Sequence, residues 1–110
     1  MLEGIFGNIN AERVLLHIYH YGEIHASAIA KDYGVSKTPL LNQLERFEAA
    51  NVLKSKEVGR SRLYSFNDKS PFTQHVKSLI EILYNTIPMD EKQSLFGERR
   101  RPRRKGKPIK

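Results

Sequence analysis

Residues 29–38 read IAKDYGVSKT, and this stretch decides the fold. Gly34 follows a helical pattern that we place at Ala26–Tyr33, and glycine readily adopts the positive φ of a tight turn. Ser36 is a good N-cap for a second helix, which we expect from about Lys37 to Ala49. A glycine turn of three to four residues sets two helices at a steep angle. The stretch therefore predicts two helices joined by a short, sharply angled connection.

The chain before this stretch predicts one more helix. Its periodic apolar face begins at Val14, Asn10 is a suitable N-cap, and Gly22 is a suitable stop. Ile24 and His25 are expected to form a short extended link to the next helix.

The chain after this stretch predicts a β-hairpin. Two segments rich in strand-forming residues, Val52–Val58 and Arg62–Phe66, flank the glycine-containing loop Gly59-Arg60-Ser61.

A last helix is expected over about residues 72–87, capped by Ser70 and started by Pro71. Pro88 ends it, and a weak final turn is expected at Asp90–Phe96. Nearly three faces of this helix are apolar, which is more than a small monomer needs, so we predict that it forms a homodimer interface. The predicted interface residues are Phe72, Val76, Leu79, Ile80, Leu83 and Ile87.

Three parts of the sequence, in order and at the right spacing, resemble the ArsR-like winged helix-turn-helix transcriptional regulators. Residues 29–38 resemble their IAxxxGVSxxT core, residues 40–53 resemble their VxxxLxxLxxAGLV stretch, and residues 59–64 resemble their wing signature GRxxxY. The resemblance implies a mainly α fold with a small β-hairpin wing, and it implies sequence-specific binding of double-stranded DNA by a regulator, more often a repressor. We expect no cofactor.

The positions that match these family motifs give a set of candidate DNA-contacting residues. They lie at the start and on the non-core face of the second helix, or at the tip of the wing: Ser36, Lys37, Thr38, Asn42, Gln43, Arg46, Arg60 and Arg62. Asn and Gln suit adenine edges, whereas Lys and Arg suit guanine or phosphate. The alternatives are an ordinary solvated helix face and a charged hairpin tip that keeps an edge strand soluble.

The net charge of +7 comes from the end of the chain. Residues 98–110 hold eight Lys or Arg and one Glu, whereas residues 1–97 hold eleven of each sign. We therefore divide the chain into a winged-helix body, 1–97, and a disordered basic tail, 98–110. This division leaves an alternative function open, in which the body is a protein-interaction module or a non-specific DNA-binding accessory protein and the tail supplies the nucleic-acid affinity.

Other functional classes have little support in the sequence. There is no cysteine, and the four histidines, with His17 and His20 on one helix, are expected at a helix surface or dimer seam rather than in a metal site. No catalytic motif is present, so we do not expect an enzyme. No apolar run is long enough to cross a membrane and no secretory signal is visible, so we expect a cytoplasmic protein. A small-molecule effector is unknown.

Overall fold

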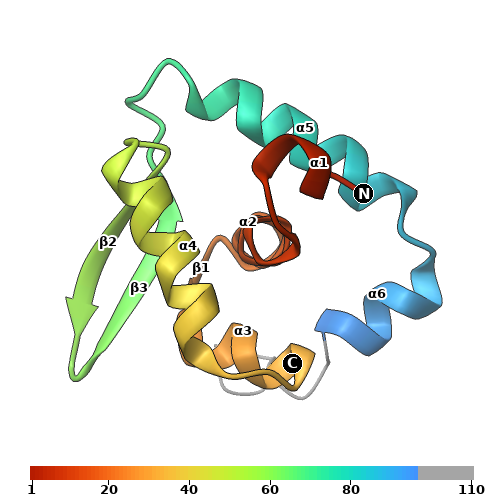
Figure 1. Cartoon of the computed structure of the whole chain (residues 1–110), viewed down its shortest axis with the longest axis horizontal. Coiled ribbons are helices and arrows are strands. Elements are labelled where there is room, and N and C mark those ends of the chain that lie inside the picture. Colours follow the sequence, from red (N-terminus) through yellow and green to blue (C-terminus); the bar gives the residue numbers. More distant parts are fainter. Residues whose placement is uncertain (97–110) are drawn as a thin grey trace, which may run out of the picture.

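The computed structural model describes residues 1–96, and residues 97–110, which include the predicted basic tail, lie outside the described part. Figure 1 shows the described elements, which are, in chain order, α1 (Glu3–Phe6), α2 (Ile9–Tyr21), β1 (Glu23–His25), α3 (Ala26–Tyr33), α4 (Lys37–Ala49), β2 (Leu53–Val58), β3 (Ser61–Phe66), α5 (Thr73–Thr86) and α6 (Met89–Phe96). No helix among residues 1–96 has the length and hydropathy to cross a membrane.

Helix α2 is the centre of the molecule. It is seen end-on in Figure 1, with the other helices arranged around it, and it packs against α3, α4 and α5. Its Val14, Leu15 and Ile18 are fully buried. The expected cap at Asn10 is wrong: the helix begins two residues earlier, and the Asn8 side chain accepts a hydrogen bond from the Ala11 N–H at 2.8 Å.

The angled pair of helices is confirmed as α3 and α4, with the predicted bounds. Gly34 has a φ of +67°, and its N–H donates to the carbonyl oxygens of the last turn of α3. Because Leu40 and Leu44 are fully buried, α4 packs with that face on the core and leaves its opposite face to solvent.

The hairpin is confirmed, but it belongs to a three-stranded antiparallel sheet in the order β1-β3-β2. The predicted extended link is strand β1, in which Ile24 lies opposite Tyr64 of β3. The loop is shorter than expected, because Ser61 pairs with Val58 and only Gly59 and Arg60 remain in the turn. Gly59 has a φ of +64°, and two-residue hairpin turns favour glycine at such a position.

Helix α5 begins at Thr73, two residues later than expected. Pro71 and Phe72 lie in a turn, and the Phe72 N–H donates to Ser70 Oγ at 3.3 Å. The buried Thr73 hydroxyl donates to the Asn67 carbonyl oxygen at 2.7 Å and so fixes the connection from the sheet.

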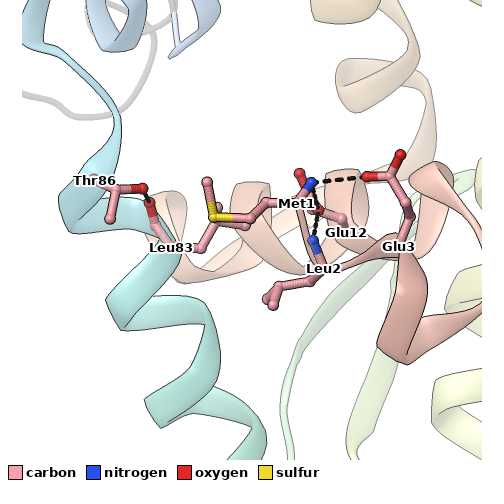
Figure 2. Close-up of polar contacts among 6 residues, drawn as sticks. All are labelled: Met1, Leu2, Glu3, Glu12, Leu83 and Thr86. Atoms are coloured by element: carbon pink, nitrogen blue, oxygen red, sulfur yellow. Dashed lines mark hydrogen bonds and ion pairs between the residues drawn. The ribbon is translucent and has the colours of Figure 1, made fainter.

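Sequence reasoning missed helix α1, which packs against α2. Figure 2 shows the N-terminal residues held on α2 by Glu12, whose Oε1 accepts from the Met1 amino group at 3.0 Å and from the Leu2 N–H at 2.6 Å. The Met1 side chain extends toward the turn of α5 that carries Leu83 and Thr86. The N-terminal segment is thus tied to the central helix by Glu12.

Candidate functional site

The exposed face of α4 carries three of the predicted site residues. Lys37, Thr38 and Asn42 are exposed, and none of their side chains has a hydrogen bond or ion pair with another residue of the described part. Thr38 and Asn42 are one helical turn apart and point to the same side. This face is therefore available to a partner.

The N-terminus of α4 is also open. Ser36 occupies the N-cap position with extended backbone, but its side chain makes no capping hydrogen bond. The first N–H groups of a helix lack intrahelical partners and form the positive end of its dipole. The start of α4 is thus suited to an anionic group.

A groove of about 250 Å³ separates α4 from the hairpin. It is lined from α4 by Lys37, Leu41 and Glu45, from the hairpin by Arg60, Ser61, Arg62 and Tyr64, and from the start of α3 by His25, Ala26 and Ser27. The groove brings together Lys37 and the two hairpin arginines, which are far apart in sequence.

The groove contains several hydrogen-bond donors. The His25 side chain makes no capping hydrogen bond to α3, whose first residues Ala26 and Ser27 line the groove. The His25 Nδ1 atom is buried without a hydrogen-bond partner among the described residues. Burial raises the pKa of the Tyr64 hydroxyl, with Glu48 and Glu45 adding to the effect, so this group stays protonated at neutral pH. The acidic Glu45 carboxylate is the exception in a lining otherwise suited to anions.

Arg62 is held within the hairpin. Its guanidinium donates to Glu57 Oε2 on the paired strand and to Ser55 Oγ, both at 3.0 Å. The Ser55 hydroxyl in turn donates to Glu48 Oε2 at 2.7 Å. This chain of contacts joins β3 to β2 and β2 to α4, whereas the neighbouring Arg60 is exposed and has no such contact.

The remaining two predicted residues of α4, Gln43 and Arg46, are partly buried or bonded within the chain. Gln43 is half-buried, and its Oε1 is buried without a hydrogen-bond partner among residues 1–96. Arg46 Nη2 donates to the Phe6 carbonyl oxygen at 3.0 Å, and the guanidinium lies 5.4 Å from the centre of the Phe47 ring. Arg46 therefore fastens α1 to the end of α4.

Sequence reasoning missed His25, Ser27 and Tyr64 as lining residues of the groove. His25 and Ser27 belong to the segment that we interpreted as a plain link and the start of a helix, and only the β1–β3 pairing brings them beside the hairpin. Tyr64 stands in the wing motif itself, so the motif contained a usable signal.

The predicted interface residues of α5 fall into two groups. Ile80 and Leu83 are 0% and 5% exposed because they pack into the core of their own chain, and Val76 and Ile87 are half-buried against it. Phe72 is 66% exposed, and Leu79 is half-buried without belonging to the core cluster.

The histidine expectation is wrong for His17, which is completely buried. Its Nε2 lies 2.9 Å from Asp32 Oδ2 of α3, and neither side chain has exposed surface. His20 stacks on the Phe96 ring with centres 4.1 Å apart. Within residues 1–96, no three His, Asp or Glu side chains are grouped as metal ligands.

Comparisons with known proteins identify the fold. No family model and no curated protein matches the chain. Among solved structures, AF1382 from Archaeoglobus fulgidus is similar at a TM-score of 0.56 and 20% identity, covering 76% of this chain and 97% of that protein. The transcriptional regulator Tm0710 from Thermotoga maritima is similar at 0.57 and 16%, covering 90% and 69%. The AntR antimony-specific transcriptional repressor is similar at 0.51 and 18%, covering 70% and 66%.

The fold is a winged helix. In a winged helix, α3 and α4 are the helix-turn-helix pair, and β2 and β3 are the wing. The groove described above is then the space between the second helix of that pair, α4, and the wing.

Proposed function

We propose that this winged-helix chain binds double-stranded DNA in a sequence-specific manner and regulates transcription. The proposal rests on the exposed face of α4, where the side chains of Lys37, Thr38 and Asn42 make no hydrogen bond or ion pair within the described residues. This face lies beside the groove, which is also lined by Arg60. Two of the similar solved structures are the transcriptional regulator Tm0710 and the repressor AntR, which supports the same role here.

The chemistry of this face suits a DNA duplex. An α-helix fits the major groove, where an asparagine amide pairs with an adenine edge and a lysine with guanine. Thr38 offers a methyl group for contact with thymine. The open N-terminus of α4 and the Arg60 guanidinium are placed for phosphates, which position the protein on the duplex.

The other predicted contacts have different parts in this proposal. Ser36 lies at the open start of α4 and contacts phosphate. Arg46 and Arg62 hold α1 and the hairpin in place through their hydrogen bonds, and Gln43, whose Oε1 is buried, does not contact DNA.

We further propose a homodimeric repressor of the ArsR-like group that acts by occluding its site, without enzymatic activity, in the cytoplasm. Two symmetric copies, paired through the region of α5, read half-sites about 34 Å apart. The body, residues 1–97, recognises the sequence, and residues 98–110 add electrostatic affinity for phosphates.

Selection from random DNA tests the proposal. The full chain is incubated with a pool of random duplexes at about 150 mM salt, and the bound DNA is sequenced. We expect a palindromic motif to be enriched by the natural chain and weakened or altered by Asn42→Ala. Asn85→Ala, an exposed asparagine on α5, is the matched control and retains the motif.

The acidic residues around the groove favour one alternative. Glu45 lines the groove, and Glu48 and Glu57 lie beside it. Together with the balanced charge of residues 1–97, they suit a body that binds a protein, with the tail alone contacting nucleic acid. DNA binding without any enriched motif, unaffected by Asn42→Ala, supports this alternative and contradicts the proposed regulator.

A further inference from the structure

One acidic side chain belongs to the surface that we propose for DNA binding. Glu45 is exposed on α4 and lines the groove between α4 and the hairpin. It follows Asn42 by three residues and Thr38 by seven, so the three side chains project from the same side of the helix. Because DNA carries one negative charge on every phosphate, a carboxylate at this position opposes the attraction that the neighbouring cations provide.

The other two acidic residues beside the groove have partners within the chain. Glu48 Oε2 accepts a hydrogen bond from Ser55 Oγ at 2.7 Å, and Glu57 Oε2 accepts one from Arg62 at 3.0 Å. Both carboxylates help to hold the hairpin, one to α4 and one across its two strands. Their place beside the groove therefore has a structural reason.

Glu45 has no such reason within residues 1–96. Its carboxylate makes no hydrogen bond or ion pair with any residue of that range, although Lys37 and Arg60 line the same groove. The fold gains no contact from this side chain. Both of its oxygens are thus available to accept hydrogen bonds from a partner.

Few groups of a DNA duplex suit a free carboxylate. The phosphates repel it, and guanine and thymine present only acceptor atoms among their polar groups in the major groove. Adenine presents an acceptor beside its amino group, which matches an amide such as that of Asn42. Cytosine presents its N4 amino group without a neighbouring acceptor, and a carboxylate is the side-chain group that accepts from it.

We infer that Glu45 recognises a cytosine by accepting a hydrogen bond from its N4 amino group in the major groove. The inference rests on the proposed function and names one base pair of the sequence that α4 recognises. Glu45 then contributes to the choice of sequence more than to affinity, because its charge penalises every site that lacks the amino group.

The spacing on α4 places this cytosine near the adenine that we assign to Asn42. Three residues advance an α-helix by about 4.5 Å, and successive base pairs are about 3.4 Å apart. The two contacts should therefore fall on base pairs that are neighbours or are separated by one other pair. Each half of the selected motif should contain both positions.

Selection from random duplexes by the full chain tests the assignment. The natural chain should enrich a C·G pair at this distance from the position that Asn42→Ala relaxes. Glu45→Ala removes the acceptor and the charge at an exposed helical position, so it should lose the preference for this pair and keep the rest of the motif. Glu81→Ala, which removes the same charge from the exposed surface of α5, should keep the whole motif.

Affinity for single duplexes measures the size of the effect. In one half of the selected motif, a T·A pair replaces the C·G pair and puts the O4 acceptor of thymine in the place of the amino group. The natural chain should bind this duplex about 5- to 150-fold more weakly, the usual cost of one mismatched base pair. Glu45→Ala should bind both duplexes nearly equally, and it should bind random duplexes at least as tightly as the natural chain does, since a repulsive charge is gone.

The outcomes separate this inference from the proposed function. A natural motif without the C·G pair overturns the inference, and so does a Glu45→Ala variant that still prefers C·G to T·A. The proposed regulator survives either result when the natural chain enriches a motif that depends on Asn42. A natural chain that enriches no motif overturns both.

Discussion

Asn42 and Gln43 are adjacent residues with the same amide group, and the turn of α4 gives them different surroundings. Asn42 is exposed, whereas the Gln43 side chain is half-buried with an unpartnered Oε1. From sequence the two were equivalent candidates for base contact. The difference depends on how α4 packs, which residue type alone does not reveal.

We therefore expect Gln43→Met to stabilise the fold and to leave the DNA motif unchanged. A buried acceptor without a partner costs about 1–3 kcal/mol. Methionine has a similar shape and no acceptor that needs a hydrogen-bond donor, so the free energy of unfolding should rise by about 1 kcal/mol. Urea denaturation measures the change, with Asn42→Met as the exposed control that gives no such gain. A loss of stability in Gln43→Met contradicts this view of the site.

The buried pair of His17 and Asp32 fastens the central helix to α3. Removing one member leaves the other without its partner in the interior, so Asp32→Ala should lower the free energy of unfolding by about 3–5 kcal/mol. Replacing both residues by leucine should cost less than the two single replacements added together, since neither member then remains opposite the other's missing side chain. Thermal or urea denaturation of the natural chain, the single variants and the double variant tests the coupling, and a loss in the double variant equal to the sum of the single losses would refute it.

At the scale of the elements, the wing contains two arginines with different roles. Arg60 is exposed at the turn, whereas Arg62 is bonded to Ser55 and Glu57. We expect Arg60→Gln to reduce the slope of log affinity against log salt by about 1, as expected when one phosphate is no longer neutralised. Salt titrations with the selected DNA measure the slope.

Arg62→Gln is the matched control for the wing, and we expect it to change the salt slope less than Arg60→Gln does. It removes the hydrogen bonds that join β3 to β2 and, through Ser55, to Glu48 of α4. Its effect should therefore be seen in the stability of the hairpin. A larger change of slope in Arg62→Gln than in Arg60→Gln contradicts the assignment.

Elements with a strong local signal were predictable from sequence. Helices α3 and α4 were predicted with correct bounds because Gly34 and the apolar spacing mark them on both sides of the turn. The cap of α2 was misplaced because Asn8 and Asn10 are chemically alike, and only the backbone decides which one accepts from an N–H. Strand β1 was predicted only as an extended link, because three residues have no periodicity and its pairing is with the distant β3. The groove was unpredictable for the same reason.

At the scale of the whole molecule, the charge of residues 98–110 contrasts with the balanced body. Replacing Arg99, Arg100 and Arg101 by glutamine should weaken binding to all DNA sequences about equally, because arginines that bind phosphates read no bases. The salt slope should fall by about 0.9 for each phosphate that these arginines neutralise in the natural chain. The test measures the affinity for the selected motif and for random duplexes at several salt concentrations, with Lys92→Gln as a control. A loss of affinity for the selected motif alone contradicts the prediction.

The β1–β3 pairing has a consequence for how the molecule opens. It joins Glu23 to Ser65, so the sheet closes a loop of chain that contains both α3 and α4. The two ends of this loop can separate only when the β1–β3 pairing is broken. Segments of a protein that unfold together often coincide with supersecondary motifs of this kind. Amide protons in β1 and in the α3–α4 unit should therefore exchange with solvent through a common opening, and the wing should not fray on its own. The surface that we propose for DNA binding would then open or stay closed as one unit.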